Sequence, residues 1–356
     1  MKEINKKKLL IELWGTYPPP YGGVTVHLKR LFHRLKEEPS FELIFLNFNG
    51  TVHAPEENIL KVKFLPWAFV ALIFKKKRIL HIHTRQVLAW VLIRIFGFRH
   101  RKLITLHNQI LRFENGWLKK KLIRFGLNGF DKIILNDNEY GHYIIKNFNV
   151  DSQKLKYIGA FLPPLESEFT GLPEEIIRFR KRKKYLLSAN AWQLVLINGN
   201  DLYGFDTLIN LVFELKKTGL DIGLIFLLPQ KGDAEYYRKM ITKIDELDLN
   251  DDILIYEKGL ANAFEVWAIS DLFLRPTYSD IEGLSVKEAL FVGTPVIASD
   301  VCQRPKNCYV YHYGDFNDIL DKAKDVLKGT LKFHKIEDMV ENFDLITDTY
   351  KELMKK

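Results

Sequence analysis

The sequence is poor in cysteine: Cys302 and Cys308 are the only two among 356 residues. They lie in one short segment without a clustered histidine, so the sequence supports neither a disulfide scaffold nor a zinc site. Reduced thiols of this kind are typical of a cytoplasmic protein. We therefore expect a fold held together by its apolar core and not by cross-links.

Long apolar runs are also absent. The longest, Phe64 to Phe74, has eleven residues, well under the ~18 needed to span a bilayer. The N-terminal stretch MKEINKKKLLIELWG contains Glu12 and no small-residue cleavage site, so it predicts a first strand and not a signal peptide. A chain that crosses no membrane is expected.

A basic balance does not identify the partner by itself. The net charge is +9, but the cations are spread along the chain and no nucleic-acid module is present, so no nucleic acid is expected as a partner. Two apolar segments, FLPWAFVALIF and VLAWVLIRIFGF, end beside the cation-rich runs 75–78 and 99–102. Two interpretations stay open: helices touching the anionic inner face of the cell membrane, or ordinary half-buried helices with basic ends.

Short apolar strands alternate with helical segments throughout, which predicts two doubly wound parallel sheets. The predicted strands of the first half are LLIELWG, FELIFLNF, RILHIHT, KLITLHN, KIILND and KLKYIG, and those of the second half are KYLLSAN, GLIFLLP, DILIYE, LFLRPT and PVIASD. A proline-rich and basic stretch separates the halves. We expect Rossmann-like domains at 1–163 and 185–334, a linker at 164–184, and a C-terminal helical segment at 335–356.

The segment 275–300, RPTYSDIEGLSVKEALFVGTPVIASD, concentrates the functional signals. A helix that begins after Gly283 would point the N–H groups of Gly283, Leu284 and Ser285 at the carboxyl end of a strand, where a diphosphate is stabilised. Asp280 and Glu288 stand on either side of that helix start. The alternative is structural, because Ser285 to Glu288 also reads as a helix-capping box.

The first domain has a second candidate loop. Gly22 and Gly23 leave backbone amides uncovered just before a helix, as a phosphate site requires, although a glycine pair also suits a tight turn. The loop lacks the G-x-G-x-x-G spacing of a dinucleotide-binding site, so the sequence disfavours a nicotinamide cofactor. His81, His83 and His107 fall at the ends of predicted strands, where open α/β sheets place ligands, and His27 lies in the helix after the glycines.

Together these residues resemble the donor-site pattern of retaining GT-B glycosyltransferases of the family 4 group, in which two acids separated by seven residues precede G-T-P-V-I. The resemblance implies a GT-B fold, two Rossmann-like domains facing a central cleft, with the terminal helix crossing back to the first domain. It assigns sugar contacts to Asp280, ribose binding to Glu288, and a position facing acceptor and donor sugar to His107. The donor-binding set it implies is Gly22, Gly23, Arg275, Glu282, Gly283, Leu284, Ser285, Glu288 and Arg304.

The sequence departs from that family at one place. The Arg and Lys that grip the diphosphate in the family are missing, and Asn190 and Tyr203 stand near their positions. Either Arg275 or Arg304 supplies the charge, or the chain mainly binds. By fold analogy the nucleobase is placed near Tyr256, Glu257 and Lys258.

The leading hypothesis is a retaining transferase that moves a sugar from a nucleotide-sugar donor to a glycan or lipid-linked saccharide in cell-surface polysaccharide synthesis. It would need no cofactor and no metal, and would act in the cytoplasm, at the inner membrane face if the basic helices bind there. The alternatives are a non-catalytic nucleotide-sugar or glycan-binding subunit and a GT-B-type sugar-nucleotide epimerase.

Overall fold

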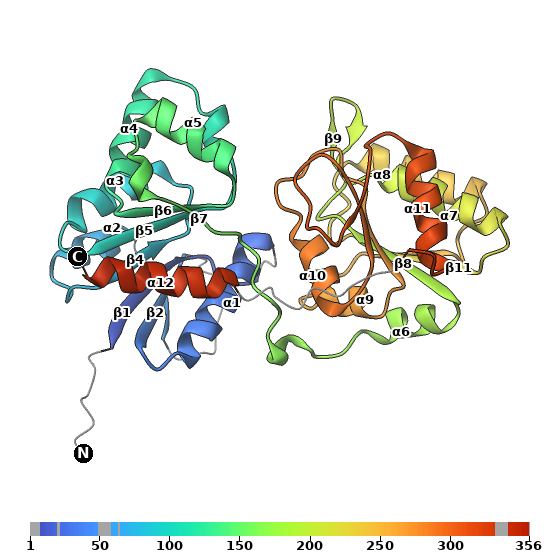
Figure 1. Cartoon of the computed structure of the whole chain (residues 1–356), viewed down its shortest axis with the longest axis horizontal. Helices are drawn as coiled ribbons and strands as arrows, with labels where there is room; N and C mark the ends of the chain where they lie inside the picture. Colours follow the sequence, from blue (N-terminus) through green and yellow to red (C-terminus); the bar gives the residue numbers. More distant parts are fainter. Residues whose placement is uncertain (1–7, 20–21, 49–57, 63–64, 332–340, 356) are drawn as a thin grey trace, which may run out of the picture. The chain divides into compact units, whose positions relative to one another are not determined.

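The computed structural model describes residues 8–19, 22–48, 58–62, 65–331 and 341–355 (Figure 1). The chain forms two compact units, one made of Met1–Leu162 with Val340–Lys356 and the other of Pro163–Met339. Each unit is a parallel sheet with helices on both faces, which confirms the predicted α/β class. Part of the C-terminal segment predicted at 335–356, namely 335–340 and 356, lies outside the described residues.

The first unit alternates strands and helices. Its strands are β1 (Leu9–Gly15), β2 (Phe41–Asn47), β3 (Ile59–Lys61), β4 (Ile79–Ile82), β5 (Arg101–Leu106), β6 (Lys132–Leu135) and β7 (Leu155–Tyr157). Its α-helices are α1 (Gly23–Glu37), α2 (Leu65–Val70), α3 (Val87–Phe96), α4 (Trp117–Asn128), α5 (Asn138–Phe148) and α12 (Glu341–Lys355). Short 3-10 turns are η1 (Ala71–Ile73), η2 (Ile110–Phe113) and η3 (Ser152–Lys154).

The sheet of this unit has the order β3-β2-β1-β4-β5-β6-β7, and the pairs are parallel. Side chains alternate between its faces, as a strand requires: Trp14 packs with α3, α4 and α5, whereas Leu13 packs with α1 and α12. The chain reverses its direction of winding between β1 and β4. Open α/β sheets bind ligands at the carboxyl edge of such a point.

Helix α12 packs against strands that precede it by more than 200 residues (Figure 1). Phe343, Ile346, Tyr350 and Leu353 are buried in the core of the first unit. The Tyr350 hydroxyl lies 2.6 Å from His81 Nδ1 on β4. The end of the described chain therefore completes the core that the first strands begin.

The second unit repeats the plan. Its strands are β8 (Tyr185–Asn190), β9 (Leu196–Ile197), β10 (Asn200–Asp201), β11 (Ile222–Leu227), β12 (Ile253–Tyr256), β13 (Leu272–Arg275), β14 (Val296–Ser299) and β15 (Tyr309–Tyr311). Its helices are η4 (Glu166–Glu168), α6 (Glu174–Lys181), α7 (Phe205–Lys217), α8 (Ala234–Glu246), α9 (Phe264–Ala268), α10 (Leu284–Val292) and α11 (Phe316–Leu327).

The main sheet of the second unit has the parallel order β12-β11-β8-β13-β14-β15. Helices α7, α8 and α11 cover one face, and α6, α9 and α10 cover the other. The winding reverses between β8 and β13. The carboxyl ends of these two strands, Asn190 and Arg275, therefore lie at the edge where ligands bind in such sheets.

Each of the eleven strands predicted from the sequence is present, with shifts of one or two residues at the ends. The structure adds strands that the sequence did not predict, each of two or three residues: β3, β15 and the antiparallel hairpin β9–β10. The segment 164–184, expected as a linker, contains α6. Ile176 and Phe179 of α6 are buried in the core of the second unit, so the amphipathic spacing of that helix outweighs the flanking prolines and cations.

Candidate functional site

The candidate donor site is built on the turn between β13 and α10. Gly283 is the N-cap of α10 and has φ 61° and ψ 61°, a left-handed conformation that glycine adopts without steric cost. Helix α10 begins at Leu284, where the sequence predicted it, and ends at Val292, followed by the C-cap Gly293, which has φ 92°. Within the described ranges the N–H groups of Leu284 and Ser285 meet no acceptor, so they stay available to an anion.

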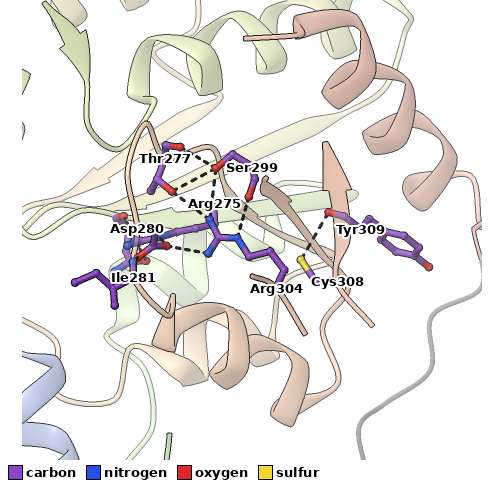
Figure 2. Close-up of polar contacts among 9 residues, drawn as sticks. Arg275, Thr277, Asp280, Ile281, Ser299, Arg304, Cys308 and Tyr309 are labelled. Carbon is purple, nitrogen blue, oxygen red and sulfur yellow. Dashed lines mark hydrogen bonds and ion pairs between the residues drawn. The ribbon is translucent and has the colours of Figure 1, made fainter. Parts of the chain in front are cut away.

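Three charged side chains meet beside this helix start (Figure 2). One oxygen of Asp280, Oδ2, lies 3.2 Å from Arg275 Nε and 2.9 Å from Arg304 NH1. The side chains are buried: 12% of Arg275, 10% of Asp280 and 1% of Arg304 is exposed. The structure thus brings together Asp280, Arg275 and Arg304, which the sequence analysis had named separately.

The protonation of Asp280 follows from these neighbours. Burial alone would raise the pKa of its carboxyl, but the guanidinium groups of Arg275 and Arg304 outweigh it, and the pKa lies below its ordinary value. The carboxylate is therefore ionised at neutral pH. Two cations against one anion leave the cluster with a net positive charge, which suits a phosphate ligand.

Arg304 is fixed by the loop that follows β14. Its Nε donates to the Ser299 carbonyl oxygen at 2.9 Å, and its NH2 lies 3.3 Å from Thr277 Oγ1. Ser299 Oγ in turn donates to the Thr277 carbonyl oxygen at 2.7 Å. Figure 2 shows this network joining the ends of β13 and β14. Thr277 and Ser299 were not predicted as site residues, although a polar residue at a strand end was the available signal.

Arg275 contacts Asn190 and Tyr203, the two residues that stand near the places where the resemblance would put an Arg and a Lys. Its NH1 lies 3.3 Å from the Asn190 carbonyl oxygen and 3.4 Å from Asn190 Oδ1. Its guanidinium carbon stands 5.3 Å from the centre of the Tyr203 ring. One arginine from β13 thus occupies the space beside both Asn190 and Tyr203. Spacing along the sequence could not reveal this, because the contacts join segments more than 70 residues apart.

The two glutamates of this segment differ in their surroundings. Glu282 Oε1 lies 2.5 Å from Lys287 Nζ, an ion pair across the helix start. Glu288 is half-buried in the second turn of α10. The capping-box alternative required Ser285 to be the N-cap, but the N-cap is Gly283 and Ser285 lies inside the helix. That alternative was wrong.

The region expected to hold the nucleobase lies at the end of β12. The Tyr256 side chain is buried in the core of the second unit, whereas Glu257 and Lys258 are exposed. Glu257 Oε1 accepts a hydrogen bond from the Tyr237 hydroxyl at 2.5 Å, and Lys258 Nζ lies 3.6 Å from Glu175. Of the three, only Glu257 and Lys258 present side chains to a ligand.

The first unit places its candidate residues at the carboxyl edge of its own sheet. Gly22 is the exposed N-cap of α1, with φ −151°, an extended conformation that any residue adopts. Its N–H donates to Thr25 Oγ1 at 2.9 Å. Gly23, the first residue of α1, is exposed as well.

A cavity of 420 Å³ opens beside this loop, at the point where the winding of the sheet reverses. Residues from the ends of β1, β4 and β5 line it, including Thr16, His83 and His107. His83 Nδ1 lies 2.9 Å from His107 Nε2, and the His27 ring centre lies 5.0 Å from that of His107. His27 and His83 therefore join His107 in one cluster.

Comparison with known proteins supports the fold. No family model and no curated protein matches the sequence. Among solved structures, a glycosyltransferase from Rickettsia africae aligns over 98% of this chain and 100% of its own, with a TM-score of 0.68 and 16% identity. Sucrose-phosphate synthase from Thermosynechococcus elongatus aligns over 98% and 100%, with a TM-score of 0.70 and 14% identity.

A third similar structure contains a ligand. HepE from Anabaena, solved in complex with UDP-glucose, aligns over 97% of this chain and 99% of its own, with a TM-score of 0.66 and 14% identity. The alignments span both units and nearly the full length of each protein. At these identities a likeness establishes the fold, and the chain therefore has the GT-B fold of glycosyltransferases, as its sequence predicted.

Proposed function

We propose that the protein is a retaining glycosyltransferase that moves a sugar from a nucleotide-sugar donor to a glycan or lipid-linked saccharide. The observation that carries the proposal is the buried Arg275–Asp280–Arg304 cluster beside the free amides of α10. Both lie at the ligand-binding edge of a parallel sheet. A nucleoside diphosphate is the group that such a combination of amides and cations stabilises.

The reaction breaks the bond between the anomeric carbon and the donor's diphosphate, and forms one to an acceptor oxygen. Negative charge grows on the leaving diphosphate in the transition state, where fixed amides and arginines stabilise it most. Asp280, which stays ionised, holds both guanidinium groups in place. By resemblance to the family, it would also contact hydroxyl groups of the donor sugar. In the proposed retaining path, a donor phosphate oxygen accepts the acceptor's proton.

On the first unit, the cavity beside His107 is the proposed acceptor pocket. It offers hydroxyls and a cation to a polar substrate, with Thr25, Thr84 and Arg85 among its lining residues. His107 is neutral, because burial and the nearby His27 lower its pKa well below the ordinary value. A neutral imidazole can accept a hydrogen bond from a sugar hydroxyl through one nitrogen, or donate one to it through the other.

The proposal is tested by incubating the protein with radiolabelled UDP-, GDP- and ADP-sugars and membrane lipid extract. Transfer of label, with the anomeric configuration of the donor kept in the product, supports it. Folded protein that neither transfers nor hydrolyses any donor contradicts it. If calorimetry then shows nucleotide binding without turnover, the chain is a binding subunit, and isomerised sugar without transfer would identify an epimerase.

Arg275 is expected to supply the positive charge that Asn190 and Tyr203 cannot. Arg275→Met should weaken binding of the preferred nucleoside diphosphate by roughly 10–100-fold, the value of one charged hydrogen bond. Arg275→Lys should recover part of the loss. Titration calorimetry measures both.

The matched control is Arg180→Met. Arg180 pairs with Asp271 at the amino end of the same strand, with 3.4 Å between NH2 and Oδ2. The substitution therefore removes another Arg–Asp ion pair, at the opposite edge of the sheet. Equal losses of affinity in the two variants would refute a specific role for Arg275.

We further propose that the first unit, which contains the proposed acceptor pocket, binds an anionic membrane surface. Ten large apolar side chains between residues 67 and 125 are exposed, and lysines and arginines stand among them; they are Trp67, Phe74, Leu88, Ile95, Phe98, Phe113, Trp117, Leu118, Leu122 and Phe125. Lys121 Nζ lies 3.7 Å from the centre of the Trp117 ring, and the guanidinium carbon of Arg94 lies 4.2 Å from that of Phe125. Within the described ranges, every helix is too short or too polar to cross a bilayer.

Vesicle flotation tests this surface. The protein should bind vesicles that contain anionic lipid more tightly than neutral ones, and Trp117→Ser with Leu118→Ser should reduce binding by about tenfold or more, since two exposed apolar groups no longer enter the bilayer. Leu345→Ser is the control, because Leu345 is exposed on α12, which covers the opposite face of the same sheet. Equal binding by the double variant and the control would overturn the assignment.

A further inference from the structure

Three histidines from separate elements meet in the first unit. His27 lies on α1, His83 follows β4 and His107 follows β5. Each offers one ring nitrogen, and these three nitrogens lie within 4.8 Å of one another. Zinc–nitrogen bonds of about 2.0–2.1 Å at tetrahedral angles place ligand nitrogens about 3.3 Å apart. The observed separations are close enough for small ring movements to reach that geometry.

The rings carry the features of metal ligands. His27 Nδ1 contacts the Ala160 carbonyl oxygen at 2.6 Å, the kind of outer contact that orients a ligating imidazole. His83 Nε2 is buried and meets no hydrogen-bond partner in the described part of the chain. Imidazole rings bind metal ions through an unprotonated nitrogen.

The fourth coordination position has room. His83 and His107 line the 420 Å³ cavity at the edge of the sheet, so a group bound between them faces open space. Among the described residues that line the cavity or form the cluster there is no Asp or Glu, so no carboxylate there would neutralise the positive charge of a bound divalent ion. Three histidines with one open position are an arrangement that zinc adopts at reactive sites, where an oxygen ligand fills the remaining place.

We propose that His27, His83 and His107 bind one divalent transition-metal ion, with zinc the best match, whose open position faces the cavity of the first unit. Each ring would present an unprotonated nitrogen to the ion and carry its proton on the other nitrogen. An oxygen of water or of an acceptor hydroxyl completes the shell. The site shares no residue with the predicted donor-binding set, whose members other than Gly22 and Gly23 belong to the second unit.

The test uses the full chain, stripped with a chelator, and titrates zinc by calorimetry and cobalt(II) by visible absorption. We expect one ion per chain at micromolar affinity or tighter, and the intense visible bands of a four-coordinate cobalt site. His27→Ala, His83→Ala and His107→Ala should each weaken binding by more than the roughly 10–100-fold that loss of an outer-shell partner costs.

Two controls separate ligation from folding. His142→Ala removes an exposed histidine of α5 and should leave affinity unchanged. His81→Gln should lower the melting temperature but retain the ion, because both nitrogens of His81 already contact Tyr350 and Thr105. The proposal is overturned if folded wild-type protein binds no stoichiometric zinc, if cobalt gives only a six-coordinate spectrum, or if His142→Ala reduces binding as much as the three ligand variants. None of these outcomes depends on glycosyl transfer.

Discussion

Replacing Arg304 by methionine is expected to lower the free energy of unfolding of the second unit by about 3–5 kcal/mol, the usual cost of breaking a buried ion pair. The side chain is 1% exposed and contacts Asp280, Ser299 and Thr277. Its loss leaves the Asp280 carboxylate buried with Arg275 as its remaining ion-pair partner in the described chain. Nucleotide binding should fall with it, since the cluster loses one of its two cations.

Asp280→Asn in the Arg304→Met background provides the check. Removing the carboxylate as well should recover part of the lost stability, because the buried charge that lost a partner is gone. Chemical denaturation of the four proteins of this cycle measures the coupling. Additive losses would show that the two side chains do not interact, contrary to their 2.9 Å contact.

The pH dependence has a definite sign. The pKa of Asp280 is lowered in the folded chain, so its carboxylate stabilises the fold above the ordinary value of ~3.9, and this contribution is lost as the pH falls through the lowered value. In Arg304→Met the pKa rises, and the acid-induced loss should begin at a higher pH. A melting series from neutral pH down to about pH 3 compares the two.

Gly204→Ala is the second change with a large expected effect. Gly204 has φ 70°, and a Cβ there would lie 2.3 Å from the carbonyl oxygen of Pro276. Pro276 is the residue that follows Arg275 in the sequence. The left-handed conformation costs a non-glycine residue about 1–2 kcal/mol, and forced overpacking about 1–3 kcal/mol more. We expect a total near 3 kcal/mol, together with weaker nucleotide binding because Pro276 must move.

Gly219→Ala is its matched control. Gly219 also has a positive φ, 82°, but a Cβ there meets nothing within 4 Å. Only the backbone cost of about 1–2 kcal/mol should appear, with nucleotide affinity unchanged. Denaturant titration and calorimetry measure both quantities. Equal destabilisation by the two variants would show that the close approach to Pro276 contributes nothing.

The periodicity of the sequence was enough for the fold because apolar strands of four to seven residues are strong local signals. LLIELWG became β1 without any shift, and the glycines at 283 and 293 marked both ends of α10. The strands that were missed have two or three residues each, which is too short to show a period, whereas the equally short β7 lies within the longer predicted run KLKYIG. Helix α6 was missed because prolines and a basic run concealed two buried apolar residues.

The sequence predicted only part of each candidate site, for a different reason. Asp280 lies near Gly283 in sequence, so one motif could find both. The contacts of Arg275 with Asn190 and Tyr203 depend on strand order, which brings the ends of β8 and β13 together. The histidine cluster is similar: 56 residues separate His27 from His83, so no short sequence motif could show that these side chains meet. The expectation that the protein needs no metal stays a prediction.

The position of α12 has a consequence for synthesis. The ribosome makes β1 before α12, with the second unit between them, although Tyr350 and its neighbours on α12 belong to the core of the first unit. At about 5–20 residues per second, the intervening stretch takes on the order of ten to thirty-five seconds to translate. During that interval the second unit can finish folding while the nascent first unit still exposes the apolar groove that α12 will fill. Chaperone contact should therefore concentrate on the first unit.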